Sequence, residues 1–357
     1  MSPAQPPPVK IVAVVAFYMS AALVMVFVNK AVLNSSPDLP LLFLLNQLLM
    51  AVVLLHISAL CIQKVEIPKL DLDSARKLTP VILVNIIGLV FNTLCLRDVE
   101  ASFFQIARGL VLPLTIAVSS AHLSTKPSIR VLLASGIVTI GFFLGVAPSS
   151  AIPVSAKPSL LSLFYGFLSS LFIAFHTVLI KSSLPYCNNS TIQLAYWTNL
   201  GSAIFLAPFV VLHGEPSRIM ELINTPSWNG SVFFWGSLVT GLFGFLLCLA
   251  GLLSIKVTSP ITHMFSSAAR SVIQTLLGVW IFRDLLTVNR AASILTILGG
   301  TMYYTWVKHV ESQPPSPREL DLEALQGKGE TDRLATVLEE DSDTDEETEK
   351  RSHDGGR

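Results

Sequence analysis

The fold class follows from residues 101–122, which read ASFFQIARGLVLPLTIAVSSAH. This stretch contains one charged side chain, Arg108. A helix needs about 20 predominantly apolar residues to cross a bilayer, and a charge at the centre of such a helix costs about 2.5–3.5 kcal/mol. Residues 259–282 repeat the pattern around Arg270. Long apolar segments, two of them with a lone arginine, predict a polytopic membrane protein.

The composition of the whole chain agrees with this class. Charged residues make up 13% and apolar residues 52%, whereas a soluble domain carries about 25% charged residues. The prediction is an all-α polytopic membrane protein with ten transmembrane helices, the first of which is not a cleavable signal peptide. The ten apolar windows lie at 9–33, 39–62, 78–97, 101–122, 128–147, 159–181, 190–212, 231–254, 259–282 and 287–308.

The formal net charge of zero hides two unlike parts of the chain. Residues 311–357 hold 15 acidic and 6 basic residues, and the rest holds 9 acidic and 18 basic residues. Because the C-terminal part has few apolar residues, it cannot bury enough surface to fold. We expect a cytosolic segment at 1–8, a transporter domain at 9–308 and a disordered acidic cytosolic tail at 309–357. Ser342 and Thr344 in the tail are open to phosphorylation, although a plainly solvated tail is favoured.

Basic residues at the helix ends predict the orientation. Ten of them flank helices on the side of the chain termini, and five flank helices on the opposite side. Short loops rich in Lys and Arg stay in the cytosol. Both termini are therefore expected to be cytosolic.

The second half of the chain echoes the first. In residues 96–108 and again in 255–270, a short basic turn precedes a helix that carries a lone arginine. With five spans in each unit, the second repeat (159–308) would enter the membrane from the side opposite to the first (9–147). Inverted repeats are typical of alternating-access carriers, whose site lies near the midplane. The alternative is a chance likeness between apolar helices. Gly141 and Gly145 are expected to let helices pack closely.

Arg108 and Arg270 are the first candidates for a binding site. Every Asp and Glu before residue 309 lies near a helix end or in a loop, so no intramembrane acid is placed to pair with them. Guanidinium groups match phosphate oxygens and stay charged, so the two suit a diphosphate or a phosphomonoester. The alternative is a structural arginine bonded to carbonyls at a helix break. Lys30 either adds to this positive field or anchors the end of the first helix.

A second candidate is the run Tyr196, Trp197, Thr198 and Asn199, which combines aromatic and amide groups suited to a purine base. Against that, Tyr and Trp near a helix end often form an interfacial belt. The other polar residues of the spans, Gln47 and His176 among them, are expected to make hydrogen bonds between helices.

Enzyme chemistry finds little support in the sequence. The HExxH and GxSxG motifs are absent. Asp71 and Asp73 have the DxD form that binds a metal–nucleotide complex in glycosyltransferases, but they lie in a loop too short for the domain that this motif needs. The four cysteines are scattered, which indicates free thiols. We expect no catalytic residue, no cofactor and no metal.

Several of these stretches resemble the nucleotide-sugar transporters of the drug/metabolite transporter superfamily, and most of all the Golgi GDP-fucose transporters. The likeness lies in GLFGF at 241–245, IKVTSPITH at 255–263, SSAAR at 266–270 and YTWVK at 304–308. Weaker matches lie at 92–96 and 196–199. The resemblance implies a ten-helix carrier of the Golgi membrane, with cytosolic termini, that exchanges a GDP-sugar for GMP.

The resemblance also implies roles for residues. In GDP-sugar carriers a Phe-Tyr-Asn-Asn motif on the seventh helix helps to recognise guanine, and only Asn199 of that motif is unchanged here, so guanine selectivity does not follow from the motif alone. On the ninth helix a run of small residues, here with Ser266 and Ser267, leads to a lysine that contacts phosphate and sugar; Arg270 takes its place. Arg108 resembles the paired basic position of the plastid triose-phosphate translocators.

The sequence thus predicts an antiporter that moves GDP-fucose or a related GDP-sugar into the Golgi lumen against GMP. Its partners would be these two solutes and the lipid bilayer, with a homodimer left open and no nucleic acid. A rival within the class carries GDP-mannose, a UDP-sugar or a phosphorylated sugar. A rival from another class is a membrane scaffold or receptor that does not transport.

Overall fold

The computed structural model describes residues 8–61, 66–123, 126–147, 159–257 and 260–312. Within these ranges the regular elements are helices, without a strand, and eight helical segments are long and apolar enough to cross a membrane. These segments are α1 (Pro8–Ser35), α2 (Pro40–Cys61), α3 (Leu72–Asp98), α4 (Ala101–Ala107) with α5 (Val111–Leu123), α6 (Ile129–Val146), α7 (Leu160–Ser183), α8 (Thr191–Leu212) and α10 (Gly230–Val257). The all-α membrane class predicted from the sequence is confirmed.

Two further long helices follow, α11 (Pro260–Phe282) and α12 (Val288–Glu311), of 23 and 24 residues. A short 3₁₀ helix, η2 (Leu184–Cys187), ends α7, and a nine-residue helix, α9 (Glu215–Ile223), lies between α8 and α10. The count of ten spans and the two inverted repeats stay predictions. Residues 1–7 and the tail at 313–357 lie outside the described residues.

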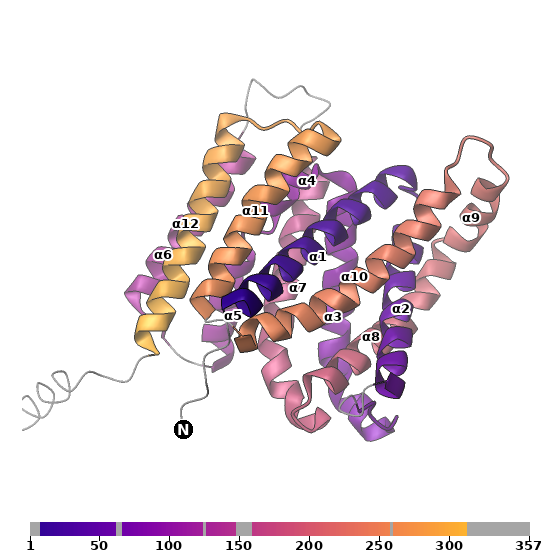
Figure 1. Cartoon of the computed structure of the whole chain (residues 1–357), viewed down its shortest axis with the longest axis horizontal. Coiled ribbons are helices and arrows are strands. Elements are labelled where there is room, and N and C mark those ends of the chain that lie inside the picture. The colour runs from indigo at the N-terminus through magenta and orange to yellow at the C-terminus, as the bar shows by residue number, and fades with distance from the viewer. Residues whose placement is uncertain (1–7, 62–65, 124–125, 148–158, 258–259, 313–357) are drawn as a thin grey trace, which may run out of the picture. The chain divides into compact units, whose positions relative to one another are not determined.

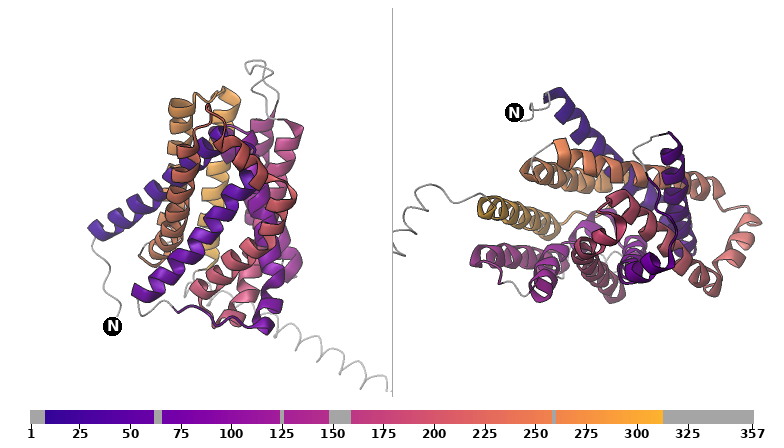
Figure 2. Two further views of the ribbon diagram at one scale, coloured as in Figure 1. Left: turned by 90° about the vertical axis from the view of Figure 1, so that its right-hand side faces the viewer. Right: turned by 90° about the horizontal axis from the view of Figure 1, so that it is seen from below.

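The helices of residues 1–308 pack as neighbours that are often distant in sequence. α1 lies along α10, α3 lies along α7 and α8, and α2 contacts both α8 and α10 (Figure 1). α11 contacts α4 and α1. The right-hand view of Figure 2 looks along many of these helices and shows them side by side as a bundle. The first and second halves of the chain are therefore interleaved.

The contact between α6 and α12 depends on glycine. A Cβ atom at Gly145 would lie 2.4 Å from Ser293 Oγ, and one at Gly141 would lie 3.0 Å from Ile297 N. Ser293 Oγ donates a hydrogen bond to Gly141 O at 2.6 Å. The expected packing role of Gly141 and Gly145 is confirmed, because any side chain there would push α12 away.

α3 begins six residues earlier than the sequence window suggested. Asp71 is its N-cap, and the carboxylate accepts a hydrogen bond from Ser74 N at 3.1 Å. This bond lowers the pKa of Asp71. The Asp71–Asp73 pair that has the DxD form is thus a helix start.

A buried carboxylate outside the spans holds the start of α2. Glu215, on α9, has no exposed side-chain surface. It accepts hydrogen bonds from Leu41 N at 3.1 Å and Leu42 N at 2.6 Å. Burial raises the pKa of Glu215, and the two N–H donors oppose this shift because they favour the charged form. Glu215 therefore caps a helix that is remote in sequence.

We expect Glu215→Ala to lower the stability of the protein by about 1–2 kcal/mol, the usual cost of losing a helix cap. The measurement is thermal unfolding of the purified protein in detergent. Glu221→Ala is the matched control, since Glu221 is exposed on the same helix and its loss should change stability by less than about 0.5 kcal/mol. Equal effects of the two variants would contradict the capping role.

Candidate functional site

The membrane segment that carries Arg108 is broken at that residue. α4 ends at Ala107 and α5 begins at Val111. Pro113 has no N–H to donate to the carbonyl four residues earlier, at Gly109, and its ring clashes there, which interrupts a helix. Ser170 Oγ on α7 donates to Ala107 O at 3.3 Å, so a carbonyl freed by the break has a partner. The sequence windows treated this segment as continuous, and the break is the main difference.

The break places Arg108 within electrostatic range of Arg270 of α11. The two guanidinium groups are close enough for their charges to repel each other. The Nε atom of each is buried and has no hydrogen-bond partner among the described residues. The carbon at the centre of the Arg108 guanidinium lies 5.6 Å from the centre of the Phe104 ring. Arg108 and Arg270, which we call the arginine pair, concentrate positive charge among apolar helices, and an anionic ligand would neutralise it.

A separate cavity of about 240 Å³ lies between α1, α2, α3, α8 and α10. Its polar wall includes Gln47, Asn199 and Thr240, and its apolar wall includes Leu48, Leu89 and Phe245. We call this cavity the amide pocket. Asn199 Nδ2 donates one of its two protons to Ala195 O at 2.7 Å, which leaves its Oδ1 and its other amide proton for a ligand.

The structure separates the four neighbours predicted to frame a base. Of the run 196–199, only Asn199 lines the amide pocket. Tyr196 is buried with its ring 5.3 Å from that of His56. Trp197 packs in a different apolar cluster with Leu78 of α3. Thr198 Oγ1 is bonded to Leu194 O of its own helix at 3.0 Å.

A smaller cavity of about 200 Å³ lies between α3 and α7, with Arg108 in its wall. Its polar residues include Asn85, Asn92 and His176. His176 Nε2 is buried and has no hydrogen-bond partner within the described part of the chain. Leu89 lines both this cavity and the amide pocket. The arginine pair and the amide pocket are thus neighbouring parts of one region.

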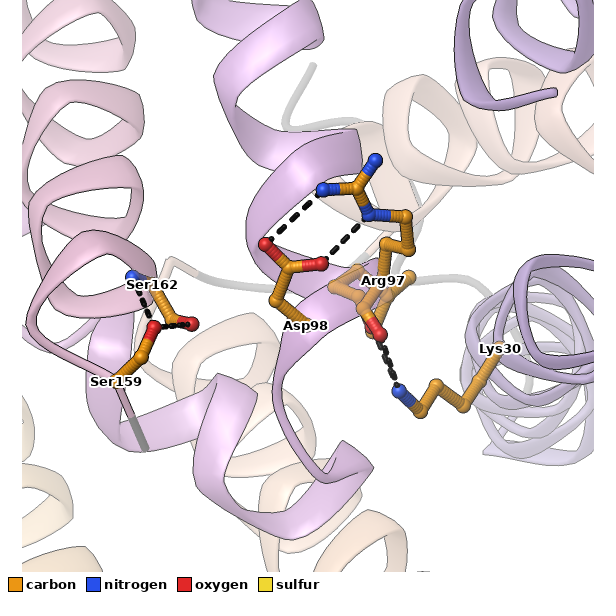
Figure 3. A network of polar contacts seen from close by, with 6 residues as sticks. Lys30, Arg97, Asp98, Ser159 and Ser162 are labelled. Carbon is orange, nitrogen blue, oxygen red and sulfur yellow. Dashed lines mark hydrogen bonds and ion pairs between the residues drawn. The ribbon is translucent and has the colours of Figure 1, made fainter. Parts of the chain in front are cut away.

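The remaining predicted site residues lie elsewhere or are only partly described. Ser266 is buried on α11, and Ser267 lies on the same helix, but its side chain is outside the described part. Lys30 is bound at the end of α3, where its Nζ atom donates to Leu96 O at 2.9 Å and to Arg97 O at 3.0 Å (Figure 3). Two of the three ammonium protons of Lys30 are therefore used within the protein.

Lys30 belongs to a group of charged residues that we call the end cluster. Its other members are Glu100, Asp284 and Arg290. Arg290 is 2% exposed, pairs with Glu100 Oε2, and donates to Leu285 O at 2.7 Å. Asp284 Oδ2 accepts from Ser102 N at 2.8 Å, in the first turn of α4. The end cluster therefore joins the start of α4 to α12 and to the connection between α11 and α12, at the end of the bundle opposite to the first turn of α1 (Figure 1).

Reading the sequence alone missed the end cluster. From the sequence, Arg290 is only a basic residue beside a helix end, and Glu100 and Asp284 are only acids in loops. The available signal was an acid in the turn beside each arginine-bearing segment: Glu100 before the segment of Arg108, and Asp284 after the segment of Arg270. That Glu100 pairs with Arg290, 190 positions away, cannot be read from spacing. Gln47 and His176 were recognised as polar, but nothing in the sequence placed them in cavities.

Comparison with known proteins gives one family. The model of the Triose-phosphate Transporter family matches residues 9–305. The chain is 30% identical over 314 residues to GDP-fucose transporter 1 of Mus musculus, covering 85% of each chain. It is 30% identical to the Golgi GDP-fucose transporter of Drosophila melanogaster, covering 85% of this chain and 91% of the relative. A UDP-sugar transporter of the same fly is 22% identical, covering 85% and 79%. The family and these relatives are transporters rather than enzymes.

The Glu100–Arg290 pair predicts an unequal response to mutation. Glu100→Ala leaves the buried Arg290 charge without its carboxylate, which costs up to about 3 kcal/mol. Arg290→Met leaves the carboxylate of Glu100, which is one-quarter exposed and can regain water. Thermal unfolding should therefore show the larger loss for Glu100→Ala, and partial recovery in the double variant. Asp38→Asn, which removes the exposed pair of Asp38 with Arg218, is the control and should change little. Equal losses from the two single variants would contradict the buried pair.

Proposed function

This chain belongs to the Triose-phosphate Transporter family, and on that premise we propose that it is a nucleotide-sugar antiporter. It carries GDP-fucose or a related GDP-sugar from the cytosol into the Golgi lumen and returns GMP. In this proposal ten helices, in two inverted five-helix repeats, span the Golgi membrane with both termini in the cytosol. The names of the relatives, GDP-fucose transporters in mouse and fly, support the substrate and the compartment.

The observation that carries the proposal is the arginine pair. Arg108 and Arg270 come from segments far apart in the sequence, and each has a buried Nε atom without a partner among the described residues. Burying two like charges side by side is unfavourable unless an opposite charge joins them. Phosphate oxygens supply that charge, and the forked guanidinium donors match their geometry. The arginine pair therefore holds the phosphates of the substrate.

The neighbouring amide pocket favours a nucleotide over a small phosphorylated sugar. Leu89 lines both the amide pocket and the cavity at Arg108, so the two cavities are neighbours that share a wall, and in our proposal one ligand occupies both. A nucleotide has a flat base at one end and phosphates at the other. The base then lies in the amide pocket with Asn199, while the phosphates lie at the arginine pair. A triose phosphate would fill only the second part.

The same charges explain obligate exchange. An empty site leaves two positive charges, each with a buried Nε atom, without a counter-ion, and this raises the energy of the unloaded carrier as it changes conformation. A nucleotide sugar or GMP neutralises the arginines in either direction. The loaded carrier therefore crosses readily and the unloaded one does not. This couples the inward movement of one nucleotide to the outward movement of the other.

The two ends of the bundle are unlike, as alternating access requires. The end cluster ties the start of α4 to α12 and to the connection between α11 and α12 at one end, through Glu100–Arg290 and Asp284. The amide pocket extends to Thr191 and Ile192 in the first turn of α8, which starts at the other end of the bundle. In our proposal the end cluster is the closed lumenal gate, and the amide pocket opens toward the cytosol.

We expect the purified protein in proteoliposomes to take up labelled GDP-fucose only when the vesicles are preloaded with GMP. GDP-mannose, UDP-galactose and a triose phosphate are measured in parallel. Uptake that requires internal GMP and prefers GDP-fucose supports the proposal. Uptake of another solute would keep a carrier and discard the guanine assignment, and no uptake of any solute by folded protein would favour a scaffold.

Within that assay, Arg270→Ala should lower exchange at least about tenfold, because a hydrogen bond to a charged group contributes about 1.5–3 kcal/mol. Arg270→Lys keeps the positive charge and should retain more exchange. Arg130→Ala is the matched control, since Arg130 is exposed near the start of α6, and it should behave as the unchanged protein does. Unaltered exchange in Arg270→Ala would remove Arg270 from the phosphate site.

A further inference from the structure

The amide pocket contains a second amide, Gln47 on α2, whose orientation is set by its neighbours. Gln47 Nε2 donates to Asn29 Oδ1 at 2.7 Å and to Thr240 Oγ1 at 2.9 Å. An amide nitrogen has two protons to donate, so both are used. Thr240 donates its own proton to Ser237 O at 3.3 Å, which leaves the Thr240 oxygen to accept from Gln47. Only Oε1 of Gln47 remains for a ligand.

Asn199 is oriented in the same sense. Its Nδ2 lies 2.7 Å from Ala195 O, and a carbonyl oxygen can be approached this closely only by a donor. Asn199 therefore keeps its Oδ1 acceptor and one Nδ2 proton for a ligand. Gln47 and Asn199 line one cavity, whose wall also holds Thr240, already committed, and the exposed Thr191. The two amides present two oxygens and the second Asn199 proton to that cavity.

We propose that Gln47, held by Asn29 and Thr240, determines base specificity by accepting a hydrogen bond from the guanine edge of the nucleotide. The inference rests on the function proposed above, because it takes the ligand of the amide pocket to be the base. Guanine carries two neighbouring donors, N1–H and the 2-amino group. Adenine places an acceptor, N1, beside its 6-amino group, and uracil has one N–H between two carbonyls. The two amide oxygens therefore match the two guanine donors, and the remaining Asn199 proton matches the neighbouring O6 of guanine. Adenine and uracil each leave one amide oxygen unpaired.

Rejection of the other bases follows from the same geometry. A buried acceptor that faces another acceptor loses its water and gains no hydrogen bond. A site built in this way discriminates more strongly than an apolar pocket does. Asn29 and Thr240 do not need to touch the ligand. They are positioning residues, because losing either one frees a proton of Gln47 and lets the amide turn its donor toward the pocket.

The test uses competition by GMP, AMP and UMP, which carry no sugar beyond the ribose, against labelled GDP-fucose uptake by the full-length protein. We expect Gln47→Leu to lower the preference for GMP over AMP about tenfold, the value of one hydrogen bond of ordinary strength in a buried site. We expect Thr240→Val to lower it less, and mainly by improving AMP, whose N1 accepts from the freed Gln47 amide. Gln193→Leu is the matched control, a buried glutamine of α8 that does not line the amide pocket, and it should keep the preference.

The outcomes separate this inference from the proposed function. If the unchanged protein binds nucleotides and Gln47→Leu keeps the full preference for GMP, Gln47 has no part in base specificity, and the arginine pair is unaffected. If Gln47→Leu changes competition by GDP-fucose but not by GMP, the amide pocket holds the sugar and the inference is wrong. If Gln47→Leu does not fold, Thr240→Val decides, because an unchanged ratio of GMP to AMP there overturns the positioning role. No competition by any nucleotide with the unchanged protein would overturn the proposed function itself.

Discussion

Two guanidinium groups within electrostatic range of each other, on apolar helical segments, are the constraint on which the rest of this structure depends. Arg108 and Arg270 repel each other, and desolvation of charge in the membrane is costly. An arrangement of this kind is stable only when a ligand or cavity water compensates it. The architecture around the pair accordingly leaves cavities there and moves the protein's own carboxylates away from it, to the end cluster.

The break between α4 and α5 shows how backbone and charge are arranged together. The helix is interrupted just before Pro113, where Val111 N donates to Arg108 O. The carbonyl of Ala107 that this leaves free takes its hydrogen bond from Ser170 of a neighbouring helix. Backbone that is not helical is tolerated in a membrane only where protein or a cavity satisfies it. The start of α4 is held by Asp284, so a short rigid helix positions Arg108 between a fixed end and a cavity. The end cluster and the arginine pair are thereby coupled through one element.

Much of the site was visible in the sequence because membrane chemistry makes certain residues rare. A lone arginine in an apolar segment is recognisable without coordinates, so Arg108 and Arg270 could be selected together. Proximity in the sequence is a poorer guide to which residues share a binding site. Residues 196–199 point to different sides of α8, since successive positions on a helix are about 100° apart, and only Asn199 lines the amide pocket. Gln47 lines the same pocket from a different helix, α2, and spacing along the chain does not show that the two residues meet there.

The sequence by itself determined the all-helical membrane class, the approximate helix windows and the two lone arginines of the apolar segments, because hydrophobic length and isolated charge are local properties of the chain. Only the tertiary structure decided which helices are neighbours, that Lys30 binds the end of α3, that Glu100 meets Arg290, and that Gln47 and Asn199 present oxygens to one cavity. The physical reason is that hydrogen bonds and ion pairs are short-ranged and directional. Whether two side chains meet depends on how helices pack, and packing is settled by the whole set of contacts at once.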